Sequence, residues 1–169
     1  MNERTLILVS GPPAAGKSTL AGSLGIELGV PVIDKDVIKE ALFEVLGTGK
    51  RDWSRTLSHA SFTVMLDLAA GLDAAILAGN FSLEIAPRLA ELSPPPIEIF
   101  CRCPTDVLVH RIKDRKRHSG HLDDTTAREV ARGVPSAKPL ELGGPVLEVD
   151  TSRSVPIEGV VDWIRTAGI

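Results

Sequence analysis

The residues that could do chemistry begin with a glycine-framed loop at positions 11–18. Its sequence, Gly-Pro-Pro-Ala-Ala-Gly-Lys-Ser, matches the phosphate-loop pattern G-x-x-x-x-G-K-[ST] in full. Glycines let backbone amides approach phosphate oxygens, and the start of a following helix adds unpaired N–H groups. In such a loop Lys17 would reach the β- and γ-phosphates of ATP, Ser18 would ligate Mg²⁺ and Thr19 would meet the α-phosphate. The expected nucleotide-binding residues of the loop are Gly11, Ala14, Ala15, Gly16, Lys17, Ser18 and Thr19.

A second polar cluster follows a short apolar run, at residues 32–39. Ligands of open α/β sheets bind beyond the carboxyl ends of the strands, so Asp34, Asp36 and Lys39 are candidate substrate residues. Asp36 could orient an acceptor hydroxyl or take its proton, and Lys39, one helical turn on, could hold an anionic substrate group. The spacing also allows a second interpretation, in which Asp34 or Asp36 merely caps the helix.

The third candidate is a basic segment within residues 105–118, which we predict to be one helix. On such a helix Arg111, Arg115 and His118 would share one face. Guanidinium groups carried over the nucleotide would stabilise charge on the transferring phosphoryl group. The alternative is an ordinary solvated basic face. His118 and His121 do not predict a zinc site, because no further ligands accompany them.

Short apolar runs alternate with helical periodicities along the chain. Strands separated by helices indicate βαβ crossovers and a parallel sheet covered on both faces. The helix expected at 53–72 would form one wall of a cleft, with Trp53, Arg55 and His59 near its start, and Asn80 would line the cleft from the end of the third strand. The same helix has plausible core residues at Leu57, Phe62, Met65, Leu66 and Ala69. We predict strands at 5–10, 31–34, 74–78, 97–101 and 145–149, and helices at 17–28, 36–46, 53–72, 83–92, 105–118, 124–132 and 157–167.

The length and composition suit one globular domain spanning residues 1–169, of which 43% are hydrophobic. A formal net charge of −3 disfavours binding along a long nucleic acid. No apolar run is long enough to span a membrane, so we expect a cytoplasmic protein. Cys101 and Cys103 are expected to be reduced residues of a buried strand. The sequence leaves monomer and homodimer open.

Two sequence patterns that the chain lacks narrow the class of nucleotide-binding protein. The chain lacks the N-K-x-D pattern of guanine-specific switches, and the third strand ends in Gly79-Asn80 rather than in the Asp-Glu typical of motor-type ATPases. Both favour a small kinase.

Together these stretches resemble the small P-loop kinases that include chloramphenicol phosphotransferase, the kinase domain of polynucleotide kinase and the zeta toxins. The matching stretches are residues 11–19, 33–39, 78–81, 111–123 and 148–152. The resemblance implies a three-layer α/β/α P-loop fold. Its five-stranded parallel sheet would have the order 2-3-1-4-5, with helices on both faces and a basic lid at about residues 111–125.

The resemblance also implies residue roles. Asp36 falls where these kinases place the carboxylate that activates the acceptor hydroxyl, and Lys17, Arg111 and Arg115 would complete the catalytic set. Arg111, Arg115 and Arg117 would be lid arginines, of which Arg111 and Arg117 contact the nucleotide. Thr151 lies where the family passes the adenine. Lys39 departs from polynucleotide-kinase-like members, which often have arginine there, and lysine lacks the bidentate fork.

The expected function is therefore transfer of the γ-phosphate of ATP, with Mg²⁺, to a hydroxyl of a small molecule. Two other enzymes remain open: a polynucleotide or nucleoside 5′-hydroxyl kinase, and a sugar-nucleotide kinase like the zeta toxins. A nucleotide-binding regulatory module without catalysis is the alternative outside enzymes.

Overall fold

Five parallel strands form the centre of the molecule in a computed structural model, which describes residues 4–81, 85–115, 118–133 and 138–168. The strand order β2-β3-β1-β4-β5 confirms the predicted 2-3-1-4-5 sheet. The strands are β1 (Thr5–Ser10), β2 (Val32–Asp34), β3 (Ala74–Ala78), β4 (Ile97–Arg102) and β5 (Val146–Asp150).

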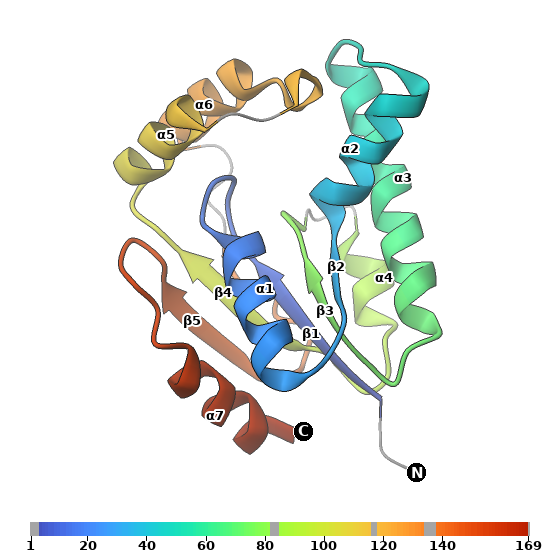
Figure 1. Cartoon of the computed structure of the whole chain (residues 1–169), viewed down its shortest axis with the longest axis vertical. Helices are drawn as coiled ribbons and strands as arrows, with labels where there is room; N and C mark the ends of the chain where they lie inside the picture. The colour runs from blue at the N-terminus through green and yellow to red at the C-terminus, as the bar shows by residue number, and fades with distance from the viewer. Residues whose placement is uncertain (1–3, 82–84, 116–117, 134–137, 169) are drawn as a thin grey trace.

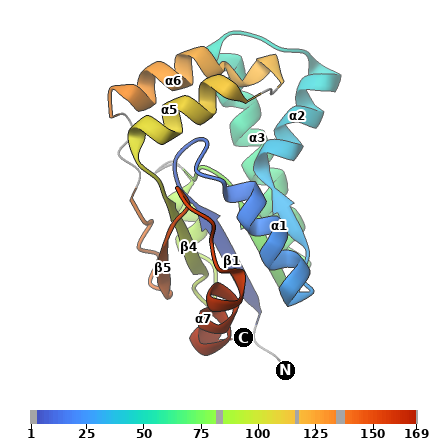
Figure 2. The ribbon, with the colours of Figure 1, turned by 60° about the vertical axis from the view of Figure 1, so that its left-hand side comes forward.

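Helices cover both faces of this sheet (Figure 1). Helices α1 and α7 pack on one face and α3 and α4 on the other, while α2 packs against α3. Figure 2 shows α5 and α6 side by side across the carboxyl ends of the strands, above the loop that joins β1 to α1. The helices are α1 (Lys17–Leu28), α2 (Lys35–Leu46), α3 (Arg51–Ala70), α4 (Ala86–Ala90), α5 (Thr105–Asp114), α6 (Asp123–Ala131) and α7 (Ile157–Gly168).

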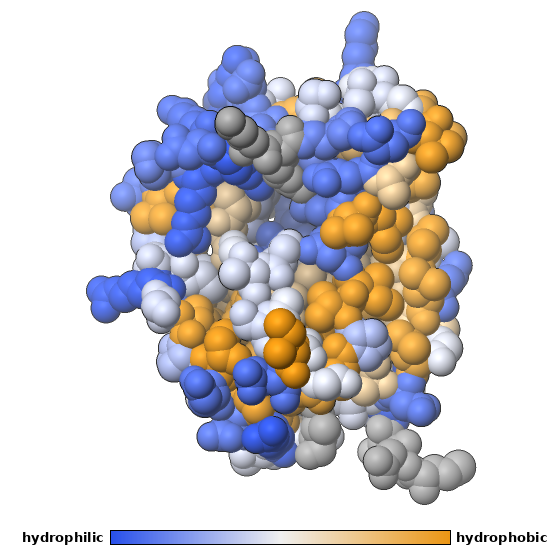
Figure 3. All heavy atoms as spheres, viewed as in Figure 1, coloured by the Kyte–Doolittle hydropathy of each residue, from blue (hydrophilic) through white to orange (hydrophobic). Residues whose placement is uncertain are grey.

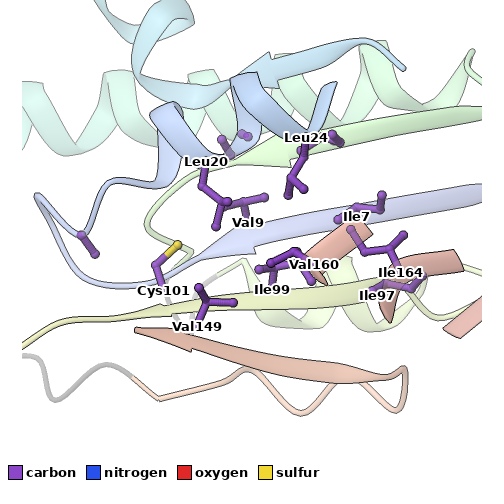
Figure 4. Packing of buried hydrophobic residues seen from close by; sticks show 14 of the residues in the cluster. Ile7, Val9, Leu20, Leu24, Ile97, Ile99, Cys101, Val149, Val160 and Ile164 are labelled. Carbon is purple, nitrogen blue, oxygen red and sulfur yellow. The ribbon is translucent and has the colours of Figure 1, made fainter. Parts of the chain in front are cut away.

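The core has two halves because successive side chains of a strand point to opposite faces of the sheet. In β1, Ile7 and Val9 pack with α1 and α7, as Figure 4 shows. Leu6 and Leu8 face α3 and α4. Both sets are buried, which explains why β1 reads as a continuous apolar run rather than an alternating one. The predicted core residues of α3 are also buried: Leu57, Phe62, Met65, Leu66 and Ala69.

One charged side chain is buried on the α3 side of the sheet. Glu98, in β4, is 1% exposed. Its carboxylate accepts a hydrogen bond from the Ser10 hydroxyl at 2.5 Å and another from the amide of Leu140 at 2.8 Å. Both oxygens are therefore satisfied, and the carboxylate ties the segment around Leu140 to the sheet.

The prediction of one helix over residues 105–118 is wrong, because α5 ends at Asp114. The backbone of Arg115 turns to an extended conformation, with ψ of 139°, and its guanidinium binds Asp123 through two nitrogens. His118 thus leaves the helix, and the expected shared face of Arg111, Arg115 and His118 does not exist. A short 3₁₀ turn that was not predicted follows at Ser119–His121.

The other predicted bounds agree with the structure to within about two residues, except for the helix at 83–92. In the described residues that helix covers Ala86–Ala90, and positions 82–84 lie outside them. No helix in the described part of the chain has the length and apolar character needed to cross a membrane.

Candidate active site

The loop between β1 and α1 has the backbone of a phosphate cradle. Gly11 has a φ of 135°, and a Cβ atom there would lie 2.5 Å from the carbonyl oxygen of Cys101, so only glycine fits. Ala14 and Gly16 are left-handed, with φ of 64° and 78°. The left-handed form costs a non-glycine residue roughly 1–2 kcal/mol, and such strain is concentrated at functional loops. α1 then begins at Lys17, so its first-turn amides lack intrahelical partners and face the loop.

Lys17 folds back over this loop. Its ammonium donates a hydrogen bond to the carbonyl of Pro12 at 2.6 Å. Burial lowers the pKa of Lys17 from 10.5 to about 8, although the carboxylate of Asp36 opposes the shift. Burial makes the ammonium form of Lys17 costly. Anionic phosphates bound in the loop would stabilise that form, because a nearby opposite charge favours ionisation.

The donor set at the start of α1 fits a magnesium ion carried by a nucleotide. Ser18 and Thr19 lie exposed on the first turn of the helix. No group of three or more histidine, cysteine, aspartate or glutamate side chains in the described residues could hold a metal ion. Mg²⁺ usually keeps several waters and takes only one or two protein ligands beside substrate phosphates. The Ser18 hydroxyl matches that pattern.

The junction of β2 and α2 places two carboxylates in different settings. Asp34 is the N-cap of α2, and its Oδ1 accepts a hydrogen bond from the amide of Asp36 at 2.8 Å. The capping interpretation therefore describes Asp34, which does not line the cavity described below. The Asp36 carboxylate lies 2.9 Å from the ammonium of Lys35. Lys35 is buried and sits 5.5 Å from the centre of the Phe62 ring.

Lys39 is held one helical turn after Asp36. Its side chain is buried, and its ammonium donates to the hydroxyl of Ser54 at 2.9 Å. That hydroxyl donates onward to the carbonyl of Gly120 at 3.1 Å. The ammonium also lies 5.3 Å from the centre of the Phe43 ring. These contacts join α2, α3 and the turn between α5 and α6.

Arg111, predicted to be a catalytic and nucleotide-binding lid arginine, contacts one backbone carbonyl in the phosphate loop and one directly after β5. It donates to the carbonyl of Thr151 at 2.8 Å and, at a longer 3.4 Å, to that of Ala14. It also approaches the sulfur of Cys103 at 3.7 Å. Thr151 is itself buried and hydrogen-bonded to the carbonyl of Arg102. Arg111 therefore links the last turn of α5 to the phosphate loop and to the expected adenine segment.

Arg115 and the turn after it close the roof of the site. Arg115 pairs with Asp123 across the turn and lines the cavity below. The predicted nucleotide ligand Arg117 lies outside the described residues.

The tip of the turn rests on Phe43 of α2. The His118 ring stacks on Phe43, with centroids 5.1 Å apart, and the His121 ring meets it edge-on at 5.7 Å. The Glu40 carboxylate lies 2.8 Å from Nε2 of His121, and the Glu44 carboxylate lies 3.3 Å from Nε2 of His118. Gly120 packs so closely that a Cβ would lie 2.6 Å from the ring of Phe43.

These elements enclose a cavity of about 520 Å³ at the carboxyl ends of the strands. Figure 3 shows the hollow between the α5–α6 side and the α2–α3 side of the molecule, edged mainly by hydrophilic residues. Six of the predicted site residues line it together. The other described ones do not: Gly11, Ala15, Gly16, Ser18, Thr19, Asp34, Arg111 and Thr151. The six are Ala14, Lys17, Asp36, Lys39, Asn80 and Arg115.

Several cavity residues were not predicted. Lys35 was not predicted, because its burial and its contact with the Phe62 ring depend on the fold. On α3, Arg51, Ser54 and Ser58 also line the cavity, at a helical spacing that could have revealed a polar stripe. Arg55 and His59 lie in the expected cleft wall, whereas Trp53 donates from its indole nitrogen to the carbonyl of Gly47.

Comparisons with known proteins agree with this architecture. The AAA domain family matches residues 6–140. A candidate kinase from Chloroflexus aurantiacus is 34% identical, with a TM-score of 0.86 over 98% of this chain and 99% of that one. No curated protein sequence matches the chain.

More distant solved structures share the fold. Shikimate kinase from Bacteroides thetaiotaomicron is 19% identical, with a TM-score of 0.64 over 96% of this chain and 97% of that one. A gluconokinase from Sinorhizobium meliloti is 16% identical, with a TM-score of 0.64 over 99% and 95% of the two chains. The sheet and its surrounding helices are thus those of P-loop kinases.

Proposed function

The chain belongs to this AAA domain family, and we propose that it is an ATP-dependent phosphotransferase that moves the γ-phosphate of ATP to a hydroxyl of a small molecule. The observation that carries the proposal is the cavity that Lys17 and Asp36 line together. One residue belongs to a phosphate loop and the other offers a carboxylate beside it. Kinase neighbours named for small polar acceptors, shikimate and gluconate, support the same class of reaction.

In this proposal the phosphate loop and Lys17 hold the nucleotide phosphates, and Ser18 ligates the magnesium ion. Bound magnesium would neutralise charge on the phosphates. Asp36 accepts the proton of the acceptor hydroxyl as its oxygen bonds to the γ-phosphorus. The bond from that phosphorus to the β-phosphate oxygen breaks, and ADP leaves. The ammonium of Lys35, 2.9 Å from the Asp36 carboxylate, would hold that carboxylate in place beside the cavity.

The segment from α5 to α6 acts as the lid in this account. Arg115 lines the cavity from above and would stabilise charge on the transferring group. Arg111 would act by positioning, because its guanidinium is bound to the carbonyls of Ala14 and Thr151. A seated lid excludes water and so limits wasteful hydrolysis of ATP.

The test is ADP release from Mg·ATP across a panel of hydroxyl compounds, with Asp36→Asn as the matched variant. The panel spans aminoglycosides, chloramphenicol, sugars, hydroxy acids, nucleosides, sugar nucleotides and 5′-hydroxyl oligonucleotides. We expect at least one compound to raise ADP release in the wild type and not in the variant, with nucleotide affinity preserved. Equal turnover by the variant would exclude Asp36 as the base. Silence across the panel with nucleotide binding intact would favour a regulatory module.

A further inference from the structure

One serine of α3 makes a contact that differs from the usual one of a buried helical serine. A serine hydroxyl inside a helix can donate to the carbonyl four residues earlier. Ser61 does so, because it is buried and donates to the carbonyl of Leu57 at 2.6 Å. Ser54 lies on the same helix and is also buried, but it donates at 3.1 Å to the carbonyl of Gly120, 66 residues away in the chain. The Ser54 hydroxyl therefore joins α3 to the turn at Ser119–His121.

Lys39 fixes the direction in which the Ser54 hydroxyl donates. The Lys39 ammonium donates to the oxygen of Ser54 at 2.9 Å. An ammonium offers hydrogen-bond donors and no acceptor, so the hydroxyl cannot point its own proton at Lys39. The proton goes to the carbonyl of Gly120. Two hydrogen bonds in series thus run from α2 through α3 to the turn, and bonds in such a chain strengthen one another.

The turn packs directly on α2 at the same place. Gly120 is buried, and a Cβ atom there would lie 2.6 Å from the ring of Phe43. The ring of His118 stacks on Phe43, and its Nδ1 accepts a hydrogen bond from the amide of Gly120 at 3.2 Å. Buried backbone carbonyls need a hydrogen-bond partner. Ser54 supplies that partner for the carbonyl of Gly120.

The connection that carries this turn also carries Arg115. Arg115 follows α5 directly, and its guanidinium binds Asp123, the first residue of α6, through two nitrogens. The pair draws together the two ends of the connection, while Gly120 lies near its tip. Arg115 lines the cavity from above. Because the pair and the tip belong to one short connection, the seat of the tip sets where the guanidinium of Arg115 lies.

We propose that Ser54 is a positioning residue, whose hydroxyl docks the turn on α2 and α3 and through that turn holds Arg115 over the cavity. The inference rests on the proposed phosphotransfer for the role of Arg115, whereas the docking stands apart from it. Without the hydroxyl, the carbonyl of Gly120 loses its partner and the turn leaves its seat more often. Arg115 is then displaced and the chemical step slows, while the phosphate loop keeps its hold on the nucleotide.

The first measurement tests the docking in the protein without nucleotide. NMR follows solvent exchange of the Gly120 amide, which is bonded to His118 only while the turn is seated. The variants are Ser54→Ala and, as the matched control, Ser61→Ala, which removes a buried hydroxyl from the same helix away from the turn. Alanine is the strongest helix former, so both changes preserve α3, and urea unfolding verifies that both variants fold.

The second measurement is phosphate transfer to an acceptor that stimulates ADP release. We expect Ser54→Ala to lower kcat about tenfold and to leave the KM for ATP within about twofold, whereas Ser61→Ala changes neither. In an Arg115→Gln background, Ser54→Ala should lower kcat by less than about twofold, because the residue that it positions is already gone.

Exchange of the Gly120 amide should be about fivefold or more faster in Ser54→Ala than in the wild type, and within about twofold of the wild type in Ser61→Ala. Equal exchange in the two variants would overturn the docking. A full tenfold loss of kcat in the Arg115→Gln background would overturn the positioning role and indicate that Ser54 contacts the substrate itself.

Failure of the proposed function is recognised separately. A protein that transfers phosphate to no compound, yet shows faster exchange in Ser54→Ala alone, would keep the docking and remove the kinase. Phosphate transfer with the same kcat and the same exchange in Ser54→Ala as in the wild type would keep the kinase and remove the role of Ser54.

Discussion

We predict that the affinity for ATP falls about tenfold between pH 7 and pH 9, because the Lys17 amine loses its proton over this range. In the free protein burial lowers the pKa of Lys17 to about 8. A bound triphosphate would raise that pKa, since anionic oxygens favour the ammonium. Binding then requires the charged form, and affinity follows its fraction in the free protein. That fraction is about nine-tenths at pH 7, one-half at pH 8 and one-tenth at pH 9.

The same shift predicts proton uptake on binding. At pH 8 about half of the free protein must gain a proton, so roughly 0.5 proton should be taken up for each nucleotide bound. Isothermal titration calorimetry with a non-hydrolysable ATP analogue, in two buffers of different ionisation enthalpy, measures both quantities. The neighbouring thiol does not interfere, because burial raises the pKa of Cys101 to about 11.

Lys17→Arg is the matched variant, because a guanidinium stays protonated throughout this range. Whatever its absolute affinity, its nucleotide binding should lose the fall between pH 7 and pH 9 and the uptake of a proton. A wild-type affinity that is flat from pH 7 to pH 9, with no proton uptake at pH 8, would refute the proposed role of the buried amine.

Three further substitutions, at Gly120, Gly11 and Glu98, test the packing that holds the site in place. Gly120→Ala places a Cβ against Phe43 and should unseat the turn, raising ATP hydrolysis relative to phosphate transfer, whereas Gly159→Ala, which has open space, should not. Gly11→Ala meets the backbone of β4 and should weaken nucleotide binding about tenfold or more by calorimetry; unchanged affinity would contradict the close-approach argument. Glu98→Ala leaves a buried hydroxyl and an amide unpaired and should cost about 2–4 kcal/mol in urea unfolding, where a loss under 1 kcal/mol would show that water replaces both bonds.

The parts that sequence predicted are those decided by neighbours along the chain. A buried strand shows as an apolar run, and α1 ends where Gly29 adopts a left-handed φ of 68°. The phosphate loop is equally local, because its conformation depends on glycines within six positions of one another. These signals were sufficient for the sheet order once the P-loop resemblance was added.

The parts that sequence did not predict depend on contacts between distant segments. The turn after α5 rests on Phe43, more than 70 positions earlier in the chain. The burial of Glu98 depends on Ser10, 88 residues away. In the sequence alone, a charged residue or a glycine at such a position cannot be told from a surface residue, because its partner lies far along the chain.

The central claim is transfer of phosphate to an acceptor hydroxyl rather than to water. ³¹P NMR of the protein with Mg·ATP and an acceptor that stimulates ADP release tests it directly. We predict that the γ-phosphate resonance is replaced by a phosphomonoester resonance, at a rate that Asp36→Asn lowers by about a hundredfold or more. Appearance of inorganic phosphate alone, at the same rate in both proteins, would contradict it.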